Sequence, residues 1–369
     1  SLTDRVGLQH GICVLVGADL TSAATDLAQK TQLTIVIESP DSDDVRKARQ
    51  QLDAAKLLGS RVYVRLLEDR RLSLANDLAG VVYVKLLNDT LPDQGELLRV
   101  VHPRGRLLLG DEVIVKPVPA GAGDWTHPYH GADNNPLAED AIALAPYLTK
   151  FLAAPYYGPM PEITLSAGGR LFKAFGHLAF KEREWPMVGK LVAMNAYNGS
   201  IEWQRDMAPG FMIHRNTIIA TPDTLYLADH LSLKLIDTAT GEIREEITIP
   251  DTVATDGPVW KWMNITDGVL YALLGEEEQL HTVHRGTRGE RGWPWTTVKK
   301  TYGAAAKSWG FGRTVLSMDL KTHEINWVRQ EEHPIDSRAM AMSGDRLFIY
   351  SHEKFLVALN AEDGKDVLG

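Results

Sequence analysis

The chain has 369 residues, of which 44% are hydrophobic and 24% charged, and its formal net charge is −9. A chain of this length is expected to form two domains, each with its own core. Lysine and arginine form no stripe along the sequence, which argues against a nucleic-acid partner. No apolar run reaches the roughly 20 residues that span a bilayer.

Residues 1–118 alternate strand and helix patterns. Apolar strands that alternate with helices indicate a parallel sheet covered on both faces, and so an α/β domain of Rossmann-like type. The single cysteine, Cys13, excludes an internal disulfide, and a small buried side chain is favoured there over a nucleophile. The predicted strands are 11–17, 33–39, 61–67, 80–86 and 106–110, and the clearest helices are 41–58 and 94–101.

The first strand, its turn, a helix and a second strand ending in Glu38 resemble the start of a class I S-adenosylmethionine (SAM) methyltransferase. The resemblance implies that a glycine loop approaches the ligand and that the acid takes the ribose hydroxyls. Only Gly17 of the expected glycines is present, and Leu20 and Thr21 have side chains where the backbone must approach closely. We therefore expect a degenerate domain kept for packing or partner contact. If SAM is bound, its contacts are Gly17, Asp19, Glu38 and Asp69.

A connector follows at 119–160, and it contains the polar stretch DWTHPYHGADNNP at 124–136. His127 and His130 are weak candidates for metal ligands, because an H-x-x-H pair in a loop has no fixed convergence. The favoured alternative is a polar loop whose Asn and Asp side chains satisfy its own turns. The ligand-binding candidates here are His127, Tyr129, His130, Asn134 and Asn135.

From residue 161 to 369 the pattern is all β, and one motif occurs four times, at 191–203, 233–245, 315–327 and 356–368. Apolar alternation, a turn and renewed alternation predict a β-hairpin. The Asn or Asp before each turn recurs at steps of 42, 82 and 41 residues. A second motif precedes each hairpin, at 168–176, 222–229, 267–275 and 344–352. In the third repeat the two motifs lie far apart, so the long step is explained by an insertion at 276–311 rather than by a skipped repeat. A period near 40 residues is typical of a β-propeller blade.

The motif resembles the propeller repeats of pyrroloquinoline-quinone (PQQ) proteins, and residues 237–241 are its best copy. The stretches 124–136, 210–227, 260–263 and 309–314 make the wider chain similar to a group of bacterial proteins, common in planctomycetes, that join a methyltransferase-like domain to such a propeller. The similarity implies a periplasmic or otherwise extracytoplasmic location, although the sequence contains no signal peptide. Since related propellers usually have seven or eight blades, four blades imply an unpaired sheet edge and a larger propeller. A missing segment or another chain would supply the remaining blades.

Two further groups of side chains are candidates for a ligand site in the propeller. A polar cluster at 214–216 could point into the channel or cap a blade. Five of the nine tryptophans lie between 260 and 309 among basic residues, which favours a carbohydrate surface or a small core of the insertion itself. The candidates are His214, Arg215, Trp262, Trp293, Trp295, Trp309 and Arg313.

The leading hypothesis is an extracytoplasmic binding or assembly protein with a small molecule or glycan as its ligand. The alternatives are a SAM-dependent methyltransferase and a PQQ-dependent oxidoreductase, so catalysis stays open. The damaged glycine loop disfavours SAM. The resemblance to quinoproteins implies calcium and often a vicinal disulfide, which one cysteine excludes, and no acidic loop suited to calcium stands out.

Overall fold

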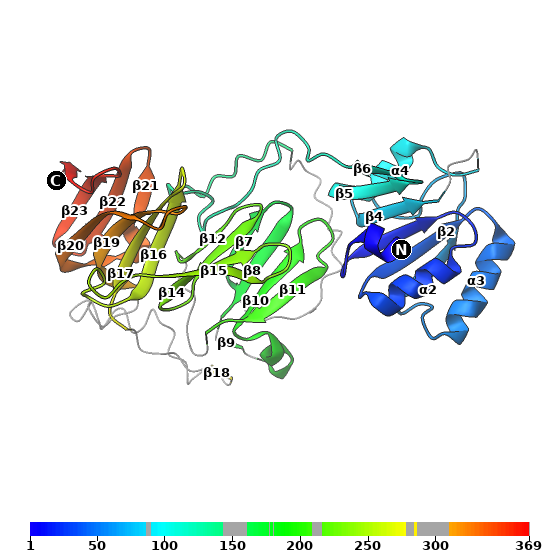
Figure 1. The fold of residues 1–369 in the computed structure, drawn as a ribbon, viewed down its shortest axis with the longest axis horizontal. Helices are drawn as coiled ribbons and strands as arrows, with labels where there is room; N and C mark the ends of the chain where they lie inside the picture. Colours follow the sequence, from blue (N-terminus) through cyan, green and yellow to red (C-terminus); the bar gives the residue numbers. More distant parts are fainter. Residues whose placement is uncertain are drawn as a thin grey trace. The chain divides into compact units, whose positions relative to one another are not determined.

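The structure is a computed structural model that describes residues 1–85, 90–142, 161–176, 178–179, 181–208, 216–277, 284–285 and 310–368 (Figure 1). The chain forms two compact units. The first comprises Ser1–Ala122, Asp140–Ala154 and Met194–Glu202, and the second comprises Gly123–Glu139, Pro155–Ala193 and Trp203–Gly369.

The first unit is built on a six-stranded sheet in the order β3-β2-β1-β4-β5-β6. Its first five strands pair in parallel, and β6 is antiparallel to β5. The predicted Rossmann-like α/β domain is therefore present. The strands are β1 (Ile12–Val16), β2 (Thr34–Ser39), β3 (Val62–Leu66), β4 (Ala79–Val84), β5 (Val101–Leu109) and β6 (Glu112–Val115), and the helices are α1 (Leu2–Val6), α2 (Thr21–Lys30), α3 (Ser42–Ala54) and α4 (Gln94–Val100).

Local sequence explains how α3 begins and which face it buries. Asp41 caps the helix, because its side chain accepts hydrogen bonds from the amides of Asp43 and Asp44. Val45, Ala48 and Leu52 then bury one face, as the helical period requires. Two separate hydrophobic clusters cover the two faces of the sheet.

Cys13 lies in the middle of β1 and is completely buried. Burial raises the pKa of its thiol to about 12, so the group stays protonated at neutral pH. The interpretation of Cys13 as a small core residue is confirmed.

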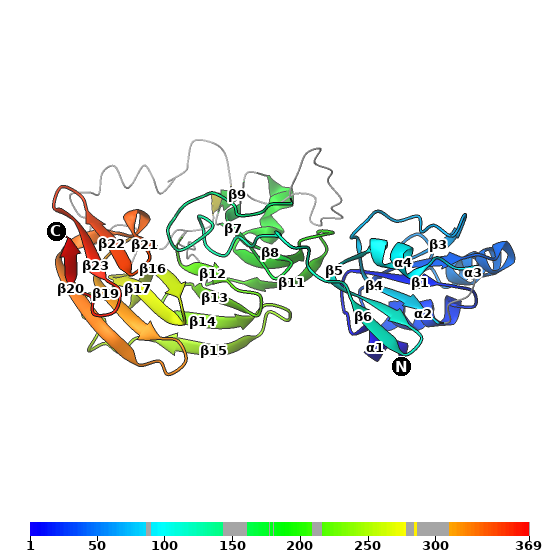
Figure 2. The same cartoon turned by 90° about the horizontal axis from the view of Figure 1, so that it is seen from above.

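The second unit is built on four four-stranded sheets, which we number in chain order (Figure 2). Only residues 194–202, around the turn between β10 and β11, are grouped with the first unit. Antiparallel pairing runs through the second, third and fourth sheets. The first sheet has β7 (Pro161–Ala167), β8 (Arg170–Phe175), β10 (Lys190–Asn195) and β11 (Ile201–Asp206); the second has β12 (Ile218–Ala220), β13 (Thr224–Ala228), β14 (Ser232–Asp237) and β15 (Ile243–Thr248); the third has β16 (Val259–Thr266), β17 (Val269–Gly275), β19 (Phe311–Asp319) and β20 (Ile325–Asp336); the fourth has β21 (Ala341–Ser343), β22 (Arg346–Ser351), β23 (Phe355–Asn360) and β24 (Asp366–Leu368).

The repeated motif folds in the same way in all four sheets. In the second sheet, Asp237 Oδ1 accepts hydrogen bonds from the amides of Ala239 and Thr240, both at 2.8 Å. Four residues after the marker, Gly241 adopts a φ of 76° and donates its amide to the Asp237 carbonyl at 2.9 Å. The same closing hydrogen bond, from the turn residue to the marker's carbonyl, joins Gly199 to Asn195, His323 to Asp319 and Gly364 to Asn360.

The predicted insertion at 276–311 falls between two neighbouring strands of the third sheet. β17 pairs directly with β19, with Leu270 opposite Met318, so the chain leaves the sheet after Gly275 and returns at Phe311. A shorter insertion in the first sheet, between β8 and β10, includes β9 (Leu178–Ala179) and the 3₁₀ helix η1 (Glu182–Met187). A short β18 (His284–Arg285) pairs in parallel with β9, so the two insertions meet.

Consecutive sheets of the second unit pack face to face. Three hydrophobic clusters join the first sheet to the second, the second to the third and the third to the fourth. Among the described residues, no such cluster joins the fourth sheet to the first. We call each of the three interfaces a seam. In the part of the chain that the structure describes, no helix is long and apolar enough to cross a membrane.

Two of the three seams are closed by the motif's tryptophan. Trp203 of the first sheet lies against Gly241 of the second and donates its indole N–H to the Thr238 carbonyl at 2.8 Å. Trp327 of the third sheet lies against Gly364 of the fourth and donates to the Ala361 carbonyl at 2.9 Å. Glycine is required because any Cβ there would meet the indole ring.

Candidate functional sites

The first candidate site is the carboxyl edge of the parallel sheet, where Rossmann-like domains bind their ligands. Gly17 follows β1 with a φ of 127°, and its amide donates to the Glu38 carbonyl at 2.9 Å. Leu20 is only 5% exposed, and its Cδ1 would lie 3.8 Å from a Cβ placed at Gly17. Asp19 has a φ of 58° and donates its amide to Asp44 Oδ1. The turn predicted to cradle a ligand is thus tied to α3 through Asp19, and Leu20 packs in the hydrophobic core.

Glu38 ends β2, as expected for the acid that takes ribose hydroxyls, but a neighbouring loop already binds it. The amide of Ser73 donates to Glu38 Oε1 at 3.0 Å, and the Ser73 hydroxyl donates to the same atom. The Glu38 residue is fully buried, and its Oε2 has no hydrogen-bond partner. Burial raises the pKa of this carboxyl, although both hydrogen bonds from Ser73 oppose the shift.

The loop between β3 and β4 brings Ser73 to this position. Asp69 lies in a tight turn of this loop, with a φ of 52°. Leu72 is buried in the sheet's hydrophobic cluster, and its amide donates to Glu96 Oε1 at 2.8 Å. Arg99 donates to the Leu72 and Leu74 carbonyls. These contacts fix the loop over the end of β2.

The second candidate site is the polar stretch after the first unit, of which we call residues 124–134 the strap. Trp125 exchanges backbone hydrogen bonds with Ser166 of β7, at 2.8 and 2.9 Å. The carbonyl of Thr126 accepts from the Ala220 amide of β12 at 2.9 Å. The Ala132 carbonyl accepts from the Met342 amide of β21 at 2.9 Å and from Asn264 Nδ2 of β16 at 3.1 Å.

The strands that bind the strap are the first strands of the four sheets, and each lies at one edge of its sheet. They are β7, β12, β16 and β21. β12 also lies against β7 and β16, so these edges come together. The strap therefore ties the inner edges of all four sheets. Asn134 completes it by donating Nδ2 to the Met340 carbonyl, while Asn135 is exposed.

His127 is the chemically unusual group of the strap. Its residue is 8% exposed, its Nδ1 is 2.8 Å from Thr126 Oγ1, and its Nε2 has no hydrogen-bond partner. Burial lowers the pKa of the imidazole to about 4, against a smaller opposing effect of Asp133. His127 is therefore neutral at physiological pH.

His127 and His130 form the two sides of a tight turn. Their backbones exchange hydrogen bonds at 3.1 and 3.3 Å, and the His130 ring lies edge-on to Trp125, with 5.3 Å between centroids. Tyr129 lies between them and is 36% exposed. In the described ranges, no three His, Cys, Asp or Glu side chains come together as metal ligands.

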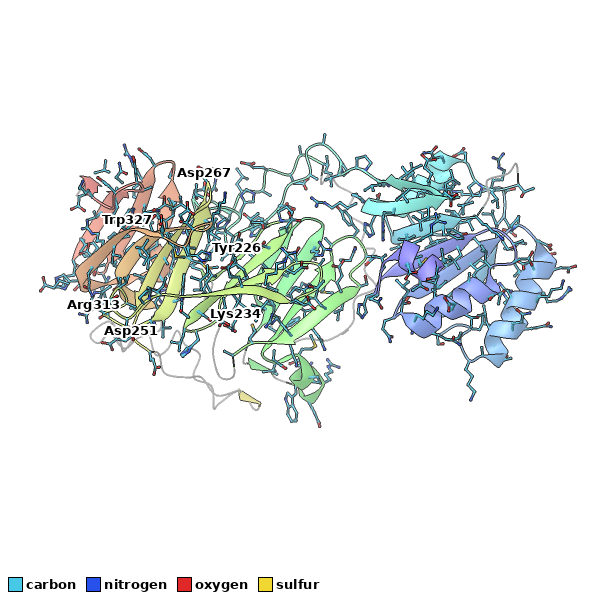
Figure 3. All side chains as sticks on the ribbon, in the orientation of Figure 1. Tyr226, Lys234, Asp251, Asp267, Arg313 and Trp327 are labelled. Carbon is cyan, nitrogen blue, oxygen red and sulfur yellow. The ribbon has the colours of Figure 1, made fainter. Side chains whose placement is uncertain are left out.

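A third candidate region lies at the base of the long insertion. Arg313 of β19, which Figure 3 labels, pairs with Asp256, with 3.5 Å between Nε and Oδ1. Lys261 of β16 is 1% exposed and donates Nζ to the Glu276 carbonyl at 2.7 Å. Burial raises the pKa of Asp256, and Arg313 acts in the opposite direction. The sequence prediction included Arg313 but missed Asp256 and Lys261.

Trp262 corrects one prediction about this region. It is 2% exposed and packs in the core between the third and fourth sheets, so its ring has no face for stacking on a sugar. The remaining candidates here lie outside the described residues, and the glycan surface stays a prediction. They are His214, Arg215, Trp293, Trp295 and Trp309.

No protein-family model matches the chain, and no match was found among curated proteins. Solved structures do match its two parts. BamB from Moraxella catarrhalis is 13% identical, with a TM-score of 0.33, over 56% of this chain and 50% of its own. A putative SAM-dependent methyltransferase from Methanococcus maripaludis is 16% identical, with a TM-score of 0.26, over 29% of this chain and 50% of its own. The quinohemoprotein alcohol dehydrogenase ADHIIG from Pseudomonas putida HK5 is 17% identical, with a TM-score of 0.31, over 54% of this chain and 38% of its own. The chain thus matches half or less of the length of each of these structures.

Proposed function

We propose that this chain is a binding or assembly protein, active outside the cytoplasm, whose methyltransferase-like domain has no open SAM site. The observation that supports this most strongly is that Ser73 already binds the Glu38 carboxylate. The carboxylate that would bind ribose hydroxyls is completely buried and accepts both its hydrogen bonds from Ser73. A ligand would have to displace the loop that Leu72 anchors in the core.

The strap supports a binding role without a quinone cofactor for the propeller sheets. The inner edges of the four sheets are already bonded to residues 125–134, so a quinone bound at these edges would have to displace the strap. A PQQ-dependent oxidoreductase is therefore the less favoured alternative, as is a SAM-dependent methyltransferase. We expect a small molecule, a glycan or a protein partner to bind at the surfaces of these sheets.

Calorimetric titration with SAM tests the proposal directly. We expect no saturable heat at millimolar SAM for the intact chain. A dissociation constant in the micromolar range that is lost in Glu38→Gln would contradict the proposal. Glu38→Gln is chosen because the amide keeps the volume of the buried side chain and can accept from Ser73. Incubation with PQQ and Ca²⁺, followed by the quinone absorbance, tests the second alternative.

We also propose that a further β-sheet, in the simplest case from a second copy of the chain, packs on the fourth sheet. Leu356 lies four residues before the marker Asn360, as Val315 lies four before Asp319. Val315 is fully buried in the seam between the third and fourth sheets, whereas Leu356 is 66% exposed. Sedimentation equilibrium should show self-association that Leu356→Lys weakens. A monomer at all concentrations would contradict the second copy as the partner.

A further inference from the structure

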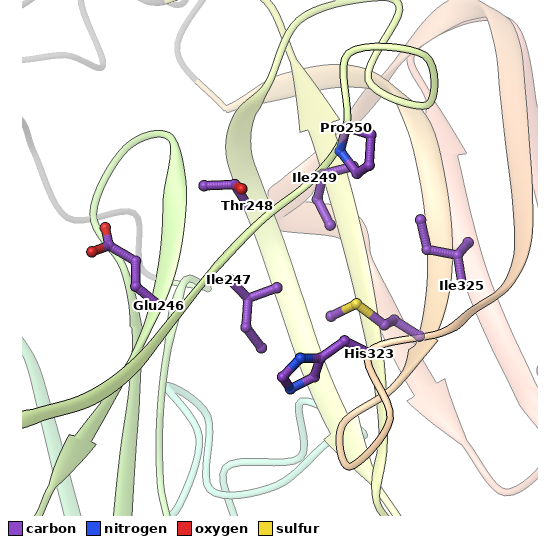
Figure 4. Close-up of a pocket in the computed structure, with 8 residues that line it drawn as sticks. Glu246, Ile247, Thr248, Ile249, Pro250, His323 and Ile325 are labelled. Atoms are coloured by element: carbon purple, nitrogen blue, oxygen red, sulfur yellow. The ribbon is translucent and has the colours of Figure 1, made fainter.

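Two apolar features of the described residues lie outside the candidate sites. One is a cavity of about 300 Å³ in the seam between the second and third sheets (Figure 4). Its walls are mainly aliphatic, from Ile247 and Ile249 at the end of β15 and from Met318 and Ile325 of the third sheet. Aliphatic walls attract apolar groups without selecting among them, so the cavity by itself identifies no ligand.

The second feature is the free edge of the first unit's sheet, at β6. Among the described strands, β6 pairs only with β5. The Lys116 amide donates to the Gly105 carbonyl at 2.9 Å, and the Lys116 carbonyl accepts from the Arg104 amide at 2.8 Å. Since alternate residues of a strand direct their backbone groups to opposite sides, Val113 and Val115 direct theirs away from β5. In the described residues, no hydrogen bond reaches these outward groups.

The side chains of β6 suit a covered position better than a free edge. Val113 is 52% exposed and Val115 is 57% exposed, and both lie on the same face of the strand. Natural sheets usually protect a free edge with charged side chains, proline or a covering segment. The opposite edge strand, β3, is protected in this way, because Arg49 donates Nε and Nη2 to the Val64 carbonyl at 3.2 and 2.8 Å. In the described part of the chain, β6 has no such cover and is the open edge of this sheet.

The sequence of β6 favours one register for pairing with a second copy. Two copies related by a two-fold axis pair antiparallel, and residues that point outward must face each other. A centre at Val115 would place Val113 opposite Pro117 of the second copy, which has no N–H to donate. A centre at Val113 would place Val115 opposite Asp111, which lies in the turn before β6. A centre at Ile114 places Val113 opposite Val115 in both directions, so the outward groups of both valines find partners.

We infer that two copies of the chain associate through β6, antiparallel about Ile114, so that two six-stranded sheets become one. This arrangement pairs the outward backbone groups and brings Val113 and Val115 of both copies into one apolar cluster on the same face of the joined sheet. A second copy fits this edge because the register about Ile114 is self-complementary. The interface lies in the first unit, so it goes beyond the proposed binding role and is independent of the association proposed for the fourth sheet.

Sedimentation equilibrium tests the inference on the intact chain carrying Leu356→Lys, which removes the association proposed for the fourth sheet. We expect a monomer–dimer equilibrium with a Kd of about 10–100 µM, because two short edge strands bury little area. Val113→Lys places a charge in the apolar cluster and should raise the Kd at least about tenfold. Leu66→Lys is the matched control, since Leu66 lies on the opposite edge strand and is 39% exposed, and it should leave the Kd unchanged.

Cysteine crosslinking in the same background tests the register. Cys13 is completely buried, so the introduced thiol is the one that reacts. With oxidised glutathione, Ile114→Cys should form a covalent dimer on a non-reducing gel, because the two Cα atoms at this position would lie about 4.5 Å apart. Val113→Cys should crosslink at least about fivefold more slowly, since its counterpart in the second copy lies diagonally across the pair.

Three outcomes would each overturn the inference: a monomer at all concentrations, an unchanged Kd in Val113→Lys, or faster crosslinking of Val113→Cys than of Ile114→Cys. If the Leu356→Lys chain is a monomer while the unsubstituted chain self-associates, the fourth-sheet proposal still stands. The two proposals therefore fail separately.

Discussion

Trp327 of the third sheet packs on the turn glycine of the fourth sheet, Gly364. Substituting this glycine measures how much the tryptophan contact contributes to the free energy of unfolding. In Gly364→Ala, the new Cβ would lie 2.7 Å from Cε3 of Trp327, well inside contact distance. The backbone φ of 69° adds about 1 kcal/mol for any non-glycine residue. The indole must also move, which breaks its hydrogen bond to the Ala361 carbonyl at a further ~1 kcal/mol and loosens its packing in the seam.

Gly268→Ala is the matched control, because Gly268 has a φ of 78° and no atom within 4 Å of the added Cβ. It should lose only the conformational contribution of about 1 kcal/mol. We therefore expect Gly364→Ala to be less stable than Gly268→Ala by about 1–2 kcal/mol. All nine tryptophans lie between residues 125 and 327, so urea unfolding followed by tryptophan fluorescence reports on the second unit. Equal free energies of unfolding for the two variants would refute a stabilising contact between Trp327 and the turn at Gly364.

Three further predictions concern buried groups. The pKa of His127 is about 4 when folded and near 6.5 when unfolded, so the unfolded chain binds the proton first as the pH falls, and stability should drop by about 2 kcal/mol from pH 7.5 to 5. His127→Asn should remove that part of the slope in urea unfolding, and parallel slopes would count against a buried neutral imidazole. Burial raises the pKa of Glu38, so Ser73→Ala should cost about 1–2 kcal/mol at pH 7 and less at an acidic pH that neutralises this carboxyl, as followed by helical circular dichroism. An equal cost at both pH values would contradict the Ser73–Glu38 contact. Lys261→Met should remove the hydrogen bond to the Glu276 carbonyl and change stability by less than about 2 kcal/mol, because the cation's burial is relieved at the same time.

The hairpin turns could be predicted from sequence because their geometry is local. A side-chain oxygen at Asp237 and a left-handed residue four positions later define the turn without help from other sheets. The same regularity located the insertion at 276–311, since the spacing of the motifs shows where residues have been added. Glu38 could also be predicted from local sequence, because it stands near the end of an apolar strand.

The partners of these residues could not be predicted, because they come from distant parts of the chain. Ser73 lies 35 residues from Glu38, and nothing around it signals a role in covering a strand end. Trp262 was assigned to a surface because tryptophans cluster near it in sequence. A register shift between Trp260 and Trp262 instead turns the two rings to opposite faces of the third sheet, where both are buried.

The strap also constrains the order in which the second unit can fold. Its residues precede every strand of the four sheets, yet Asn134 binds Met340, 206 residues later in the chain. During synthesis this segment leaves the ribosome first and must wait until the fourth sheet has formed. Contacts of such high sequence separation slow folding. We expect the last folding step to be the closing of residues 124–134 across sheets that have already assembled.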